Sequence, residues 1–246
     1  MDRDEILRVL RAFDVAGLEY VLIGATAMAF HGVVRATEDI DLFVRATPEN
    51  VERLRTALRA AYAGDPHIDD IRAEDLLGEY PSVRYYPPSG DLYFDVMTRL
   101  GEAARFETVE AEVKDVQGIR VRVATPLALY RLKRRTARPI HHQDAAALRQ
   151  LFNLDEEGKP VPVQKFRSIE EMNAAPVLAP DKQPFERFLR HCARYWAIAP
   201  RTYPRGVFRF RTIEDAQEAR QRCSSEVTES TRGDRRRRDG GSLSRA

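Results

Sequence analysis

Two aspartates, Asp39 and Asp41, are the residues whose type and spacing most clearly suggest chemistry. They lie in the stretch YVLIGATAMAFHGVVRATEDIDLFV, which runs from Tyr20 to Val44. The apolar residues around them predict a half-buried strand, in which positions i and i+2 point to the same face. Two neighbouring carboxylates repel each other, and a divalent cation is the usual compensation. The pair therefore indicates a metal or catalytic site, and two solvated aspartates on an edge strand are the alternative.

The elements that position this pair follow from apolar spacing and from capping residues. Thr47 and Thr125 each precede a proline, which is typical of a helix start. Gln117-Gly118 joins two alternating segments and predicts a hairpin turn. Strands are expected over 19–23, 40–44, 82–86, 92–98 (which carries Asp95), 112–116 and 119–124, and helices over 4–16, 25–30, 47–63, 125–133 and 141–151.

The composition excludes several classes of protein. The chain has 246 residues, with 43% apolar and 32% charged side chains, as in ordinary globular proteins. It has no apolar run of about 18 residues, so no membrane span and no membrane partner are expected. The N-terminal residues are acidic and amphipathic, unlike a signal peptide. The two cysteines lack metal-type spacing, and a reducing, cytoplasmic location is expected.

The net charge of +2 conceals an asymmetry along the chain. Residues 1–164 hold 22 basic and 27 acidic side chains, a net of −5, whereas residues 165–246 hold 18 and 11, a net of +7. The two parts could attract each other, or the basic part could contact nucleic acid. A solvated basic surface without a partner is the alternative.

The chain order suggests a division into four parts. We predict a main domain over residues 1–153 and a linker, containing glycine and prolines, over 154–164. Residues 165–223 form a small C-terminal module in which an FR-S/T-IE pattern occurs at 166 and again at 210, with an amphipathic helix over 185–196 between them. Residues 224–246 are a basic tail that is expected to be disordered. The module could bind a partner or cover the site of the main domain.

The segment before residue 153 resembles a known family of enzymes. A strand, a glycine turn, a small-residue helix, a strand with Asp-x-Asp and a later strand with a third aspartate are similar to the DNA polymerase β-like nucleotidyltransferase superfamily. Within it, the chain most resembles AbiEii-type and related minimal bacterial nucleotidyltransferases, which include toxins of toxin–antitoxin systems. The resemblance rests on Gly24-Ala25-Thr26-Ala27, His31-Gly32, Arg35-Ala36-Thr37, Glu38-Asp39-Ile40-Asp41-Leu42, Asp95, Lys133 and Asp144.

The resemblance implies an α+β nucleotidyltransferase fold, with a mixed central sheet, flanking helices and a small, mainly helical C-terminal extension. It also implies transfer of an NMP from an NTP to an acceptor hydroxyl. Asp39, Asp41 and Asp95 would hold Mg²⁺ or Mn²⁺, and Asp95 would favour loss of the hydroxyl proton. The acceptor would be the 3′ end of tRNA or another RNA, or a protein hydroxyl.

Further residues take roles from the same resemblance. Backbone N–H groups at Gly24, Ala25 and Thr26 would receive the triphosphate, and Lys133 would contact phosphate. Asp144 would take part in catalysis or only orient Lys133. Possible partners are an antitoxin or the chain's own C-terminal module.

Some of these residues allow more than one interpretation. Arg35 could steady phosphate or pair with Glu38, and His31 is expected to pack at a helix end rather than bind a ligand. Ala25 stands where the family usually has Gly or Ser, so a serine hydroxyl toward phosphate is missing unless Thr26 supplies one. The alternative function is therefore a degenerate transferase fold that binds a nucleotide or a protein.

Overall fold

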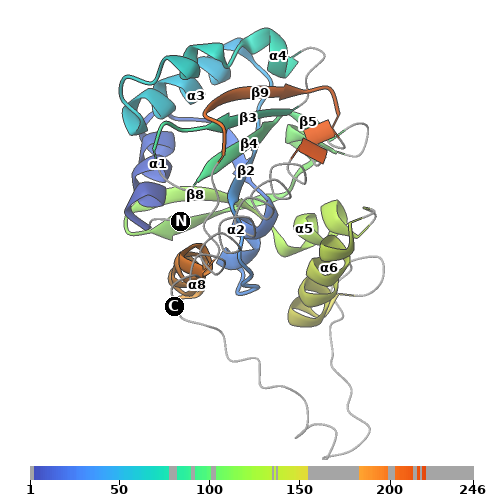
Figure 1. The fold of residues 1–246 in the computed structure, drawn as a ribbon. Coiled ribbons are helices and arrows are strands. Elements are labelled where there is room, and N and C mark those ends of the chain that lie inside the picture. Colours follow the sequence, from blue (N-terminus) through green and yellow to red (C-terminus); the bar gives the residue numbers. More distant parts are fainter. Residues whose placement is uncertain are drawn as a thin grey trace, which may run out of the picture.

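A seven-stranded mixed sheet forms the centre of the protein in the computed structural model (Figure 1). The structure describes residues 3–77, 82–89, 92–100, 104–134, 136, 138–154, 183–198, 203–212, 215–216 and 218–219. The strand order is β7-β8-β1-β2-β4-β3-β9, and β5 and β6 form a separate two-stranded sheet. The strands are β1 (Tyr20–Leu22), β2 (Asp39–Val44), β3 (Ser82–Tyr86), β4 (Tyr93–Met97), β5 (Arg99–Leu100), β6 (Ala104–Arg105), β7 (Ala111–Val116), β8 (Ile119–Ala124) and β9 (Gly206–Phe210). This architecture confirms the predicted fold class.

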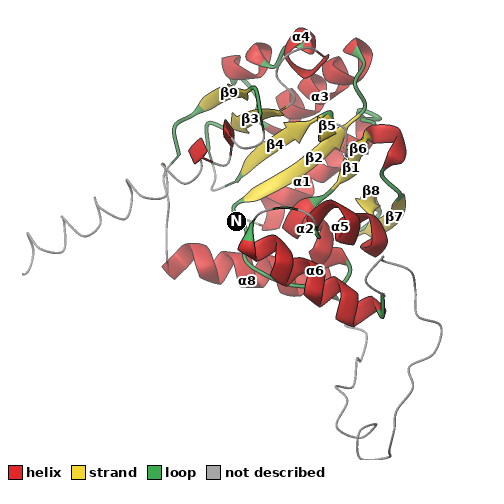
Figure 2. Cartoon of the chain, turned by 90° about the vertical axis from the view of Figure 1, so that its right-hand side faces the viewer, coloured by secondary structure: helices red, strands yellow, loops and turns green. Residues whose placement is uncertain are grey.

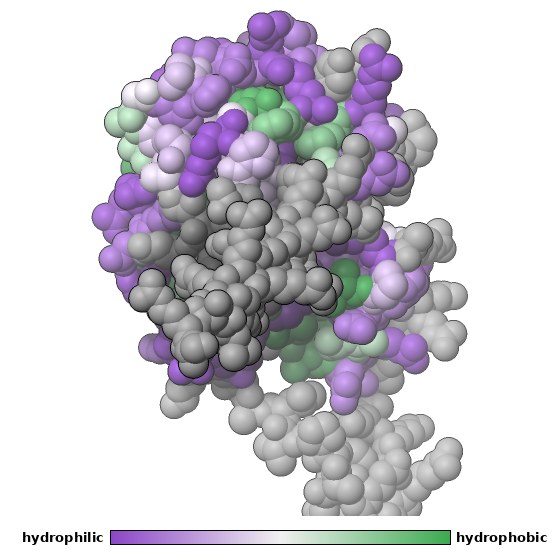
Figure 3. Space-filling model, in the orientation of Figure 1, coloured by the Kyte–Doolittle hydropathy of each residue, from purple (hydrophilic) through white to green (hydrophobic). Residues whose placement is uncertain are grey.

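Helices lie on both sides of the sheet, as the two views in Figures 1 and 2 show. They are α1 (Arg3–Val15), α2 (Gly24–Phe30), α3 (Pro48–Ala61), α4 (Ala73–Leu77), α5 (Pro126–Lys133), α6 (Pro139–Phe152) and α8 (Pro184–Ile198), with 3₁₀ turns η1 (Pro66–Asp70) and η2 (Phe106–Thr108). Helix α1 packs against α3 and β8, whereas α2 packs against β2 and α8. Polar residues dominate the outer surface around α3 and α4, at the top of Figure 3.

Side-chain alternation gives the two faces of the sheet different characters. Phe94 in β4 contacts the rings of Phe13 from α1 and Tyr62, which follows α3, at 6.3 and 6.2 Å between centroids. These residues belong to the hydrophobic core. Asp95 follows Phe94 in the strand, so its side chain points to the opposite face. The α1–α3 layer therefore fills the apolar face and leaves the carboxylates on the other.

Local sequence signals account for many of the element boundaries. The Thr47 and Thr125 hydroxyls accept hydrogen bonds from the N–H groups of Asn50 and Ala128, both at 3.2 Å, so both predicted caps are confirmed. Gln117 and Gly118 both have positive φ, at 56° and 78°, which suits the two-residue hairpin turn between β7 and β8. None of the helices in the described ranges has the length and apolar character needed to cross a bilayer.

The C-terminal third contributes to the same sheet and core. Strand β9 pairs antiparallel with β3, and the Phe185 ring of α8 stacks on Phe30 of α2 at 4.3 Å. The predicted helix over 185–196 is confirmed, whereas β9 was not predicted. Phe210, the first residue of the second FR-S/T-IE pattern, ends this strand. The first copy of the pattern, most of the linker and the basic tail lie outside the described residues, and the domain boundaries stay predictions.

Candidate active site

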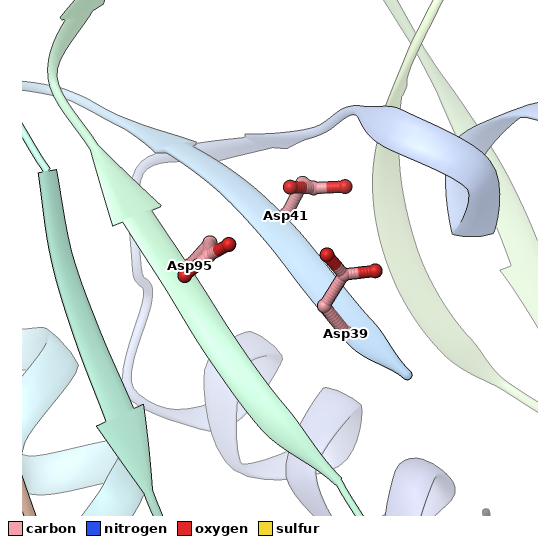
Figure 4. Close-up of side chains that lie close together, drawn as sticks. All are labelled: Asp39, Asp41 and Asp95. Atoms are coloured by element: carbon pink, nitrogen blue, oxygen red, sulfur yellow. The ribbon is translucent and has the colours of Figure 1, made fainter. Parts of the chain in front are cut away.

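The three aspartates singled out from the sequence lie together on one side of the adjoining strands β2 and β4 (Figure 4). The strands run parallel, and their register places Asp41 directly opposite Asp95. Asp39 lies two positions before Asp41 and therefore on the same face. One carboxylate oxygen from each residue lies within 4.8 Å of the other two. Asp39 and Asp95 are buried and Asp41 is half-buried, so the group is placed by backbone pairing and not by flexible side chains alone.

The turn before α2 fits closely around Asp41. The backbone N–H of Ile23 donates to the Asp41 carbonyl at 3.0 Å. Gly24 has φ +69°, and a Cβ built on it would lie 1.7 Å from Asp41 Oδ2. Only glycine fits this close approach, because any side chain would displace the carboxylate. The glycine turn is therefore part of the carboxylate site.

Two threonines hold the Asp39 end of the group. The Thr37 hydroxyl donates to the Asp39 carboxylate. The Thr26 hydroxyl in α2 donates to the Asp39 backbone carbonyl at 3.2 Å and is buried. Thr26 thus ties α2 to β2 in this structure, and its hydroxyl is engaged with the strand. Ala25 beside it is also buried and offers only its backbone.

Arg84 is a site residue that the sequence analysis missed. It lies in β3 opposite Asp95, with its Nε 2.6 Å from Asp95 Oδ1 and its Nη2 3.0 Å from Oδ2. Burial lowers the pKa of the guanidinium, but the Asp95 carboxylate outweighs burial and the net shift is upward. The available signal was a basic residue inside the otherwise apolar strand segment SVRYY. Its partner could not be read without the strand register.

A second charged cluster, the Lys133 cluster, consists of Lys133 of α5, Asp144 of α6 and Arg35, which precedes β2. Lys133 Nζ lies 2.8 Å from Asp144 Oδ2, and Arg35 donates to both Asp144 oxygens at 2.9 and 3.2 Å. Arg35 therefore pairs with Asp144. The predicted alternative, a pair between Arg35 and Glu38, was wrong. Glu38 instead accepts a hydrogen bond from the Tyr203 hydroxyl.

Electrostatics link the second cluster to the carboxylate group. Burial lowers the pKa of Lys133, and the carboxylates of Asp144 and Asp41 offset part of that shift. Burial would raise the pKa of Asp144, but the charges of Lys133 and Arg35 outweigh it and hold that pKa below its usual value. Lys133 is thus a buried cation close enough to Asp41 for the two charges to interact.

Two histidines, His31 after α2 and His141 in α6, are held by hydrogen bonds. The His31 Nε2–H donates to the Ala124 carbonyl at 2.8 Å, and its ring meets Phe152 edge-on. Burial lowers its pKa, which fits a neutral packing residue as expected. His141 lies 2.8 Å from the Thr136 hydroxyl through Nδ1 and accepts from Arg138 through Nε2.

A partly open cavity of about 380 Å³ borders Arg84. The residues that line it with Arg84 are Tyr86, Pro204, Phe208, Phe210, Asp215 and Ala219. Most of this lining comes from β9 and the residues around it. Aromatic rings and the buried guanidinium that pairs with Asp95 therefore border this space.

The donor set suits a hard divalent cation. Carboxylate oxygens are preferred ligands of Mg²⁺ and Mn²⁺. Asp39, Asp41 and Asp95 each offer one carboxylate oxygen at a mutual spacing that could hold a metal ion. Two adjacent strands fix all three carboxylates, so the residues present fit such an ion.

A family model described as nucleotidyl transferase AbiEii toxin, type IV toxin–antitoxin system, matches residues 6–152. The chain belongs to the AbiEii family. The match spans both charged clusters and confirms the resemblance inferred from the sequence motifs. No curated protein matches the chain. The AbiEii match supports nucleotidyltransferase activity in general and a place in a toxin–antitoxin system, while α8 and β9 lie outside the matched residues.

Proposed function

We propose that this AbiEii-family protein transfers a nucleoside monophosphate from an NTP to an acceptor hydroxyl, with Mg²⁺ or Mn²⁺ held by Asp39, Asp41 and Asp95. The observation that carries the proposal is the register that sets Asp41 beside Asp95, with Asp39 on the same face. A bound divalent cation would neutralise charge on the reacting phosphate. The protein acts as the toxin of a toxin–antitoxin pair, with an antitoxin as its partner.

The reaction divides between the two charged clusters. The acceptor oxygen attacks the α-phosphorus, the bond to the α–β bridging oxygen breaks, and pyrophosphate leaves. Asp95 accepts the proton of the attacking hydroxyl. Lys133, oriented by Asp144, contacts the triphosphate with a fixed positive charge. Arg35 orients Asp144 from its other side and adds positive charge near the phosphates.

The turn before α2 forms the remaining wall of the nucleotide site. Gly24, Ala25 and Thr26 begin α2 directly beside Asp41, and their backbone N–H groups are the first of the helix. We expect them to receive phosphate oxygens through the backbone alone, because the Thr26 hydroxyl is engaged with β2. The grip on the triphosphate therefore relies on backbone groups and Lys133.

The cavity beside Arg84 supports an RNA 3′ end as the acceptor. Arg84, which lines this cavity, pairs with Asp95, the residue that would meet the acceptor hydroxyl, and aromatic rings border the same space. Aromatic side chains stack on unpaired bases, which is a common way to hold single-stranded RNA. A tRNA or another RNA 3′ end fits this lining better than a protein hydroxyl does.

Labelled transfer tests the proposal directly. Purified protein is incubated with each labelled NTP, Mg²⁺ or Mn²⁺, and total RNA, and the products are separated by size. We expect label on RNA that disappears with a chelator and in the double variant Asp39→Asn, Asp41→Asn. Absence of label with all four NTPs, together with equal effects of wild type and double variant on cell growth, would overturn the enzyme proposal.

A second function is favoured by Ala25 and by the engaged Thr26 hydroxyl, which leave no side-chain hydroxyl in the turn for phosphate. In this alternative the protein binds a nucleotide without transferring it. Saturable NTP binding in calorimetry, combined with no transfer in the labelling assay, would favour that function.

A further inference from the structure

The Arg84 side chain is fixed by burial and ring contacts in addition to its ion pair with Asp95. Its side chain is 2% exposed, and both Asp95 oxygens accept hydrogen bonds from it. Its guanidinium carbon also lies 5.1 Å from the ring centroids of Tyr93 and of Phe210. A planar guanidinium held in this way can fix the plane of the carboxylate that it pairs with.

The C-terminal segment completes this arrangement. Arg84 Nη2 donates to the Ala216 backbone carbonyl at 3.1 Å, and Phe208 of β9 lies opposite Arg84 in the strand pairing. These residues follow the family-matched segment by more than fifty positions. The orientation of an active-site carboxylate therefore depends on contacts from the C-terminal segment.

The charge of Arg84 matters because the carboxylates are close together. Three ionised aspartates within 4.8 Å carry a charge of −3, and Arg84 reduces it to −2, which one divalent cation balances. We infer that Arg84 is a positioning residue for nucleotidyl transfer: it is the internal counter-charge of Asp95 and fixes the carboxylate that faces the acceptor. This inference rests on the proposed function.

The counter-charge can be tested by Mn²⁺ binding in isothermal titration without any nucleotide. Both Arg84→Gln and Arg84→Lys lose the paired hydrogen bonds to Asp95, but only Arg84→Gln also loses the positive charge, so we expect Mn²⁺ to bind about tenfold more tightly to Arg84→Gln than to Arg84→Lys. Equal or weaker Mn²⁺ binding by folded Arg84→Gln than by Arg84→Lys would overturn the counter-charge.

The positioning role has a kinetic readout. Lysine cannot form the two parallel hydrogen bonds to Asp95, so Arg84→Lys should lower kcat for labelling of RNA about tenfold or more and leave KM for the NTP unchanged. If Arg84 had a purely structural role, its substitution would lower the melting temperature without lowering kcat at an unchanged KM. Wild-type kcat in Arg84→Lys would overturn the positioning role, and this variant decides the matter where Arg84→Gln does not fold.

Arg209 provides the matched control on the same strand. It donates to Asp75 from β9 and so anchors this strand without reaching Asp95. Arg209→Gln should change neither Mn²⁺ affinity nor kcat; if it matched Arg84→Gln, strand docking alone would explain both effects and the inference would fail. The Mn²⁺ measurement stands apart from the proposed function, because it needs no transfer. A wild type that binds Mn²⁺ but labels nothing would refute only the transfer, and absence of Mn²⁺ binding in all variants would refute both.

Discussion

The carboxylate group and the Lys133 cluster are built on opposite electrostatic principles. Asp39, Asp41 and Asp95 bring like charges together, and strand register forces them to stay close. Lys133 and Asp144 bring opposite charges together across two helices, within 2.8 Å and largely out of water. The first arrangement keeps a net negative charge even with Arg84 and gains stability from an added cation, whereas Lys133 and Asp144 already compensate each other. The comparison suggests that one cluster binds a ligand by its excess charge and the other presents a fixed charge to it.

The largest effect should come from breaking the like-charged cluster. Asp41→Asn removes one ligand charge and should lower transfer by about a thousandfold or more, measured as labelled RNA. The melting temperature should change little or rise, because repulsion among the carboxylates falls. Asp4→Asn, at an exposed position in α1, serves as the control and should act as wild type. Transfer within tenfold of wild type in Asp41→Asn would remove this residue from the site.

A smaller loss of transfer is expected when a side chain is added beside the same three carboxylates. Gly24→Ala places a Cβ against Asp41 and at a positive φ, so we expect about a hundredfold lower transfer and a loss of about 2 kcal/mol in unfolding free energy. Gly17→Ala is a matched control, since Gly17 has φ +63° but no atom within 4 Å of the added Cβ. It should lose stability and keep full transfer. Equal transfer losses in the two variants would show that backbone strain, not contact with Asp41, is responsible.

Breaking the compensated cluster should affect nucleotide binding more than the acceptor side. In Lys133→Met we expect kcat/KM for the NTP to fall about a hundredfold, with part of the loss in KM, because the fixed charge on the phosphates is gone. Asp144 still accepts hydrogen bonds from Arg35, so stability should fall by only about 1–3 kcal/mol. Lys114→Met, in the β7–β8 hairpin, is the control. An unchanged KM for the NTP would contradict a phosphate role.

The smallest effect concerns the pH dependence of the protein's stability, to which His141, near Lys133, contributes. Burial, with help from Lys133 and Arg138, lowers the pKa of His141 to about 3. An unfolded histidine binds a proton below about pH 6.5, so between these values protons favour unfolding, and stability present above pH 6.5 is lost on acidification. His31 has a lowered pKa for the same main reason and acts in the same direction.

We therefore expect the melting temperature of wild type to fall by a few degrees, about 2–5 °C, between pH 7.5 and 5.5. His141→Gln should fall less over this range, while His191→Gln, at an exposed position on α8, should match wild type. Differential scanning fluorimetry across this pH range measures the difference. The same slope in all three proteins would contradict the burial of His141 as its cause.

The sequence predicted the features that depend on local order. Alternation placed Asp39 and Asp41 on one face, and the capping residues Thr47 and Thr125 located two helix starts. These signals are local, because a strand period and a cap each involve only a few neighbouring residues. The family resemblance supplied Asp95, Lys133 and Asp144, which local patterns alone do not connect.

The missed features depend on contacts between distant parts of the chain. Arg84 meets Asp95 through the β3–β4 register, and Arg35 meets Asp144 across more than a hundred residues. Pairing with Glu38 was one of two predicted roles for Arg35, but the packing of α6 brings Asp144 to Arg35 instead. Strand β9 was not predicted, because the FR-S/T-IE pattern that begins at Phe210 gives no local strand signal and pairing with β3 determines the conformation of this segment.

The position of β9 at the edge of the sheet has a consequence for biosynthesis. Its partner β3 and the strand β4, which carries Asp95, end by residue 97, and β9 begins at residue 206. At usual rates of translation, roughly 5–20 s pass between the synthesis of these segments. A ribosome-bound chain therefore carries Asp39, Asp41 and Asp95 well before the strand that supports Arg84 exists. Under the proposed function, full activity should follow the synthesis of β9, so a newly made chain would pass through an interval in which it is not yet competent.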